Sequence, residues 1–74
     1  MPHRLEVGDL VTFAHRDNMY TGSIIADVAT GPNDSHCFRV QTQNVIKDGT
    51  HKLVKPFSVD YPASALSLVR VHGM

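Results

Sequence analysis

The sequence predicts an all-β protein whose five short strands close into a small barrel. Three observations support this fold class. β-branched and aromatic residues recur in short runs, turn residues separate the runs, and Asp48-Gly49 is a strong signal for a tight hairpin. No segment shows the apolar spacing of a long helix. We expect the 74 residues to form one domain, 1–74, with an ordered core at about 7–71.

The first two expected strands lie in the N-terminal half of the chain. LVTFAH (10–15) alternates in polarity, so Val11 and Phe13 share one face of the strand. MYTGSIIADVA (19–29) is longer and contains Gly22. Because glycine inside a strand commonly marks a bulge or a close approach of two backbones, we expect one of these at Gly22.

The third and fourth expected strands form the hairpin around Asp48-Gly49. HCFRVQTQNVI (36–46) follows a loop of Gly, Pro, Asn and Asp. Its alternation places one set of side chains on a common face, namely Phe38, Val40, Thr42, Asn44 and Ile46. The fourth strand is expected at about 51–59. Pro56 cannot donate a hydrogen bond to a strand ladder, so it indicates an edge position, a bulge or a later start of this strand.

The last expected strand follows a corner at Tyr61-Pro62. ASA (63–65) predicts a single 3-10 turn, and LSLVRV (66–71) predicts the fifth strand. Five strands in this order, with a long second and third strand, are typical of an SH3-like barrel. An OB-type barrel normally carries a helix between its third and fourth strands, and the Asp-Gly turn leaves no room for one.

Three stretches carry a more specific pattern: VGDLVTF near the start, TGSII in the second strand and YPASALSLV near the end. Together they resemble the plasmid- and integron-borne type II dihydrofolate reductases, which are SH3-like barrels of nearly this length. The Gly-Asp opening matches at Gly8 and Asp9, and the Gly-x-Ile pattern matches at Gly22 and Ile24. The resemblance implies the barrel fold and an origin on a mobile genetic element.

The same resemblance places the family's catalytic Val-Gln-Ile-Tyr segment at Ser58, Val59, Asp60 and Tyr61, where the tyrosine alone is kept. The lysine that the family carries in its first strand is also missing. That family binds folate and nicotinamide in a pore at the centre of a tetramer, and aspartates in such a pore would repel an anionic cofactor. We therefore expect shared architecture without shared activity, with no catalytic residue and no cofactor.

Two other classes of SH3-like barrel bind ligands through aromatic side chains. Peptide-binding SH3 domains use a groove that includes a tryptophan, and this chain has none. Tudor-type modules enclose methylated lysine or arginine in an aromatic cage. Phe13 and Phe38 lie in apolar alternations that favour core packing, so a cage would need Tyr20, Phe57 and Tyr61.

Composition limits the remaining classes. The net charge is zero, with −3 over residues 1–35 and +3 over residues 36–74, so bulk charge does not predict nucleic-acid binding. Cys37 is the single cysteine, which excludes a disulfide within the chain, and the five histidines lack the spacing of a metal site. No apolar run approaches the ~20 residues of a membrane span, so we expect a cytoplasmic protein without membrane contact.

Two candidate surfaces follow from these patterns. The first is a contact surface for another protein, formed by one face of the third strand and the corner before the last strand: Cys37, Arg39, Gln41, Gln43, Asp60 and Tyr61. The second is the basic hairpin at 39–55, whose cations are Arg39, Lys47, Lys52 and Lys55. Cations contact phosphates and the interleaved amides contact base edges, although lysines on an edge hairpin also prevent edge-to-edge pairing of strands.

The function expected from the sequence is a small non-enzymatic binding or assembly module. Self-association is expected because a chain of this size buries only about 60% of its surface on folding and gains stability from a partner. The first alternative is a nucleic-acid-binding barrel that uses the hairpin at 39–55. The second alternative is an NADPH-dependent dihydrofolate reductase of the type II class.

Overall fold

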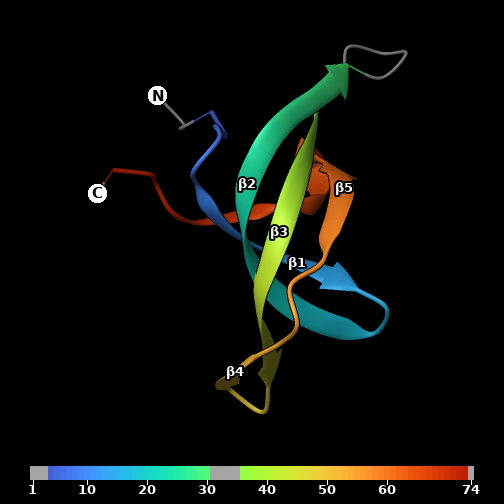
Figure 1. Ribbon diagram of the computed structural model, residues 1–74, viewed down its shortest axis with the longest axis vertical. Helices are drawn as coiled ribbons and strands as arrows, with labels where there is room; N and C mark the ends of the chain where they lie inside the picture. The colour runs from blue at the N-terminus through green and yellow to red at the C-terminus, as the bar shows by residue number, and fades with distance from the viewer. Residues whose placement is uncertain (1–3, 31–35, 74) are drawn as a thin grey trace.

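The computed structural model describes residues 4–30 and 36–73, which form an antiparallel sheet curled into a half-barrel (Figure 1). The strands are β1 (Leu10–His15), β2 (Asn18–Thr30), β3 (His36–Lys47), β4 (Thr50–Leu53), β5 (Ser58–Pro62) and β6 (Ser67–Arg70). A 3-10 turn, η1 (Ala63–Ala65), precedes β6, and no α-helix occurs in the described residues. The predicted all-β class and the 3-10 turn before the last strand are confirmed.

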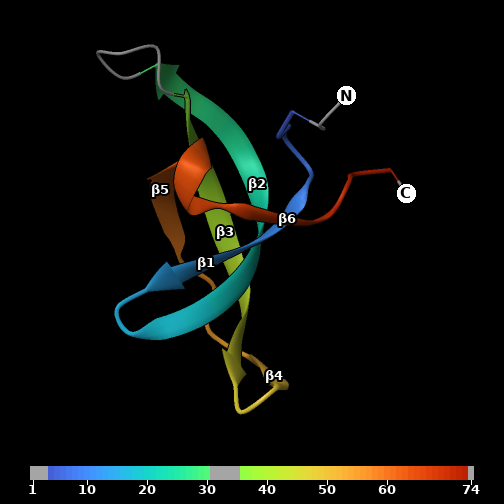
Figure 2. The ribbon, with the colours of Figure 1, turned by 180° about the vertical axis from the view of Figure 1, so that it is seen from behind.

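The sheet has the order β4-β3-β2-β1-β6, and β5 also pairs with β3. β4 pairs with the C-terminal half of β3, whereas β5 pairs with its N-terminal half. The long strand β2 curves, and Figure 2 shows β1 and β6 crossing in front of β2 and β3. The curvature of β2 therefore lets one continuous sheet form both layers of the half-barrel.

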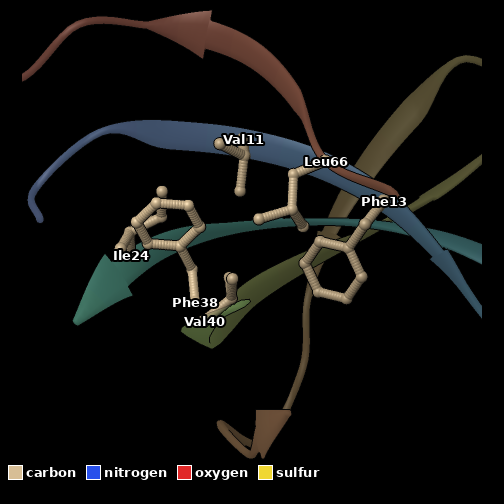
Figure 3. Packing of buried hydrophobic residues seen from close by; sticks show 6 residues of the cluster. All are labelled: Val11, Phe13, Ile24, Phe38, Val40 and Leu66. Carbon is tan, nitrogen blue, oxygen red and sulfur yellow. The ribbon is translucent and has the colours of Figure 1, made fainter. Parts of the chain in front are cut away.

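The hydrophobic core lies between these two layers (Figure 3). Six buried side chains form it: Val11, Phe13, Ile24, Phe38, Val40 and Leu66. The predicted alternations of the first and third strands place their apolar residues correctly, because Val11 with Phe13 and Phe38 with Val40 all enter this core. The backbone N–H of Leu66 donates to the carbonyl of Ala63 at 3.1 Å, which closes η1 just before Leu66 enters the core.

The fourth strand, expected at about 51–59, is divided in two by residues 54–57. Pro56 lies in this interruption, where its missing N–H costs no ladder hydrogen bond. Thr42 bridges the gap: its hydroxyl donates to the carbonyl of Phe57 at 3.0 Å and accepts the N–H of Phe57 at 3.1 Å. The expectation of five strands is therefore corrected to six, although both pieces still pair with β3.

Gly22 marks a bulge, as its position inside a strand predicted. The register of β2 against β3 shifts between Thr21 and Gly22, because Gln43 is an extra residue on β3. The two backbones also approach closely, since a Cβ added to Gly22 would lie 2.5 Å from the carbonyl oxygen of Gln41. Any larger residue would therefore require a shift of the backbone.

The bulge reverses the alternation of β3, and the predicted face is wrong beyond it. Thr42 is fully buried, as the common face with Phe38 requires. After the extra residue Gln43, however, Val45 is buried at 7% exposure, whereas Asn44 and Ile46 are half-buried. One inserted residue exchanges the two faces because side chains alternate with a period of two.

The two terminal segments lie side by side and are joined by Asp9 (Figures 1 and 2). Asp9 is fully buried, and its carboxylate accepts the backbone N–H of Glu6 and of His72, both at 2.9 Å. Gly8 has a φ of +100°, and a Cβ there would lie 2.8 Å from the Cβ of His72. We call this arrangement of Glu6, Gly8, Asp9 and His72 the terminal latch.

Candidate functional site

Five rings gather where the end of β1, the start of β2 and the segment before β5 meet. They belong to Phe13, His15, Tyr20, Phe57 and Tyr61, and contacting rings have centroids 5.4 to 6.1 Å apart. This spacing is typical of favourable aromatic packing. Phe13 belongs to the core, whereas the other four rings are half-buried.

An open depression of ≈ 410 Å³ lies against three of these rings. Its lining consists of His15, Arg16, Tyr20, Phe57, Ser58 and Val59, and we call it the aromatic depression. Tyr20 and Phe57 meet edge to face, with centroids 5.4 Å apart and planes at 87°. His15 lies 5.5 Å from the Phe57 ring, so three elements of the half-barrel contribute one ring each.

Tyr61 supports His15 from β5. Its hydroxyl lies 2.6 Å from Nδ1 of His15, a hydrogen bond that fixes the orientation of the imidazole ring. The register of β5 places Tyr61 opposite Phe38 and places Asp60 opposite Arg39. Because neighbouring residues of a strand point to opposite faces, the predicted contact surface is divided: Tyr61 faces the rings and Asp60 faces outward.

Asp60 and Arg39 neutralise each other on the outer face. The guanidinium approaches the carboxylate at 2.9 Å (Nε to Oδ1) and 3.3 Å (Nη2 to Oδ2). This hydrogen bonding lowers the pKa of Asp60 below its usual range and raises the pKa of Arg39. Both side chains are about half exposed, at 48% and 45%, so the pair contributes little to stability. The pair nevertheless neutralises the positive charge of Arg39.

The other members of the predicted contact surface lie along β3. Gln41 and Gln43 are exposed, and Nε2 of Gln43 donates to Oγ of Ser23 at 2.8 Å. Cys37 carries a free, half-buried thiol. The structure therefore brings the β3 residues together with the outward-facing Asp60, and it separates them from Tyr61.

Two lysines of the basic hairpin, Lys47 and Lys52, point to the face of the sheet that carries Tyr20 of the aromatic depression. Val45 is opposite both Tyr20 of β2 and Lys52 of β4, so these three side chains share one face of the sheet. Lys47, two residues beyond Val45 on β3, points to the same face. Lys55 is exposed in the segment between β4 and β5. Arg39, the fourth cation of the predicted hairpin, points to the opposite, outer face of the sheet, where it contacts Asp60.

His15 and Arg16 are site residues that the sequence reasoning did not assign. The sequence suggested a cage only from the tyrosines and Phe57, because the contact between His15 and Tyr61 joins residues 46 positions apart. The alternation of the first strand, which puts His15 on the same face as Phe13, is the signal that could have found it.

Within residues 4–30 and 36–73, no group of three or more His, Cys, Asp or Glu side chains is placed to hold a metal ion. In the same ranges, no helix has the length and apolar character of a membrane span. No protein-family model matches the chain, and comparisons with curated proteins and with solved structures give no significant match.

Proposed function

We propose that the protein is a small non-enzymatic binding module of the SH3-like barrel class that holds its ligand in the aromatic depression. The observation that carries this proposal is that three half-buried rings, those of His15, Tyr20 and Phe57, line one open depression. Phe13 (1% exposed) and Phe38 (4%) lie inside the core, whereas Tyr20 packs against the core with one part of its ring and lines the depression with another. The part of these rings that faces the depression offers flat, rigid contact area to a ligand.

The pairing of the strands supports the SH3-like class. The last strand pairs with the first, and the long second strand bends to pair with both the first and the third. A 3-10 turn leads directly into the last strand. The aromatic depression of this chain lies between the β1–β2 turn and the segment that precedes β5.

Amide-resolved NMR titration tests the proposal with three probes: an oligothymidylate, a proline-rich peptide and a peptide that carries trimethyl-lysine. We expect one of them to shift the signals of Arg16, Tyr20 and Phe57, and we expect Tyr20→Leu to remove the shifts. The proposal is wrong if no probe perturbs these signals, or if the shifts map to the outer face around Arg39 and Gln41 instead.

Self-association is a second candidate, because apolar side chains are exposed on the outer face. The register aligns Ala14, Met19 and Ile46 across β1, β2 and β3, and Met19 is 43% exposed. Leu53 on the edge strand β4 is 87% exposed. Exposed apolar residues beside an open strand edge favour coverage by another chain. Light scattering should show an assembly that Leu53→Lys dissociates, and a strict monomer at high concentration contradicts this candidate.

The reductase alternative has its own test. Ser58 and Val59, which stand where the type II dihydrofolate reductases carry the first two residues of their catalytic segment, line the aromatic depression. The next residue, Asp60, is engaged by Arg39 on the opposite face. We expect neither NADPH binding by calorimetry nor reduction of dihydrofolate. Saturable NADPH binding would reverse this assignment.

A further inference from the structure

We propose that the aromatic depression binds single-stranded nucleic acid, with bases stacked on its rings and phosphates held by the neighbouring cations. This inference rests on the proposed function, because it names the ligand class of the same site. It joins two features that are separate in the sequence: the aromatic residues and the basic hairpin.

The rings supply a stacking surface. Tyr20 and Phe57 come from different elements, meet at a right angle and line one cavity together with His15. Every base has a π-face, and stacking on an aromatic side chain therefore works with any base sequence. The depression of ≈ 410 Å³ is open, so its rings are accessible to a flat group such as a nucleotide base.

Cations flank these rings on two sides. Arg16 lines the depression itself. Tyr20 of β2 and Lys52 of β4 are both paired with Val45 of β3, so their side chains lie on the same face of the sheet. Lys47, two residues after Val45 on β3, also points to this face. Within the described residues, none of these three cations takes part in an ion pair. Their charge is therefore available to phosphate groups that run along the sheet.

The distribution of charge also favours an anionic ligand over a methylated ammonium group. No carboxylate lines the depression, whereas Arg16 does. Asp17 follows Arg16 in the exposed β1–β2 turn and is not part of the lining. A trimethylammonium group would be repelled by Arg16, and a phosphate would be attracted.

A single strand fits these features better than a duplex. Bases in a duplex are stacked on each other and do not present their faces to a protein ring. Duplex binding without base contacts depends on many phosphate contacts, and this chain has a net charge of zero. The depression therefore suits unstacked bases with a few phosphates on either side.

Fluorescence anisotropy with a labelled oligothymidylate, compared with a duplex of the same length, tests the stacking. At low salt we expect saturable binding of the single strand and much weaker binding of the duplex. Tyr20→Leu and Phe57→Leu should each weaken binding by about fivefold or more, because stacking contributes on the order of 1–3 kcal/mol per base. Circular dichroism checks that each variant is folded, and either folded variant is sufficient for the test.

The lysines are tested through the dependence of affinity on salt. Replacing Lys47 and Lys52 together by Gln should reduce the slope of log affinity against log salt by about 1.4, since each lost phosphate contact removes roughly 0.7 on a single strand. Arg39→Gln is the control for the loss of a cation from the opposite face. It removes a cation from the same hairpin, but from the opposite face and from a pair with Asp60, so binding should not change.

Several outcomes overturn the proposal. Absence of oligothymidylate binding at low salt contradicts it, and so does an Arg39→Gln variant that is as impaired as the double lysine variant. If the proline-rich or trimethyl-lysine peptide shifts the signals of the depression and oligothymidylate does not, this inference fails while the proposed function stands. If no probe shifts them, both fail.

Discussion

The two ends of β1 are built in different ways. Before its first residue, the carboxylate of Asp9 is fully buried and takes backbone hydrogen bonds from Glu6 and His72. At its last residue, His15 joins half-buried rings around an open depression. The carboxylate at the centre of the terminal latch is therefore buried, whereas the aromatic depression is open and lined by both apolar and polar groups.

This difference separates stability from binding. A buried carboxylate that accepts two N–H groups stabilises the fold, since its loss leaves those donors without a partner in a buried place. The half-buried rings of the depression contribute less to stability than fully buried rings, because part of their surface stays in water. We expect substitutions in the terminal latch to lower the free energy of unfolding with little effect on ligand binding, and substitutions in the depression to do the opposite.

The largest effect is expected at Asp9. Asp9→Ala leaves the N–H groups of Glu6 and His72 without their acceptor, so the free energy of unfolding should fall by about 3 kcal/mol. Asp9→Asn is the control, because it keeps one acceptor oxygen and should lose less. Urea denaturation measures both. If Asp9→Ala unfolds with the wild-type midpoint, the terminal latch has no structural role.

Two threonines form the next comparison. Thr42→Val removes the hydroxyl that bridges the gap between β4 and β5 at Phe57, and the free energy of unfolding should fall by about 2 kcal/mol. Thr21 is the matched control, because its buried hydroxyl has no hydrogen-bond partner among the described residues. Thr21→Val should therefore be neutral or stabilising in the same denaturation experiment. Equal losses in the two variants would contradict the bridging role of Thr42.

A smaller effect is expected at Tyr61. Tyr61→Phe keeps the ring but removes its hydrogen bond to His15, so the free energy of unfolding should fall by about 1 kcal/mol. His15 also loses the contact that orients its ring, and the imidazole signals of His15 should broaden or shift in NMR spectra. Unchanged imidazole signals would show that the hydroxyl of Tyr61 does not hold His15.

The smallest effect is expected from the exposed contact of the terminal latch. A hydrogen bond from Nε2 of His72 to Glu6, at 2.7 Å, raises the pKa of His72 above its usual value. Protonated His72 is thus favoured in the folded state. Its contribution is complete below the ordinary histidine pKa of about 6.5 and is lost as the pH rises through the raised value.

Glu6→Gln is the variant that isolates this effect. The wild type should lose slightly more stability than Glu6→Gln when denaturation is repeated from about pH 6 to about pH 9. Both side chains are about half exposed, so the difference should be small and should shrink with added salt. Identical pH profiles for the two proteins would contradict the assignment.

Local patterns in the sequence determined much of the fold. The first strand, 10–15, agrees with β1, and the next two strands agree within one residue at each end. The hairpin turn at Asp48-Gly49, the bulge at Gly22 and the turn before β6 were also predictable. Each depends on the conformational preferences of neighbouring residues, which the sequence states directly.

Tertiary structure alone decided which of these elements meet. The extra residue Gln43 reverses which side chains of β3 face the core. On β5, the register against β3 places Tyr61 beside the rings and Asp60 on the outer surface. The depression exists because the curled sheet brings the end of β1 beside the segment that precedes β5. The alternation of a strand defines its two faces, but the curvature and register of the whole sheet decide what each face contacts.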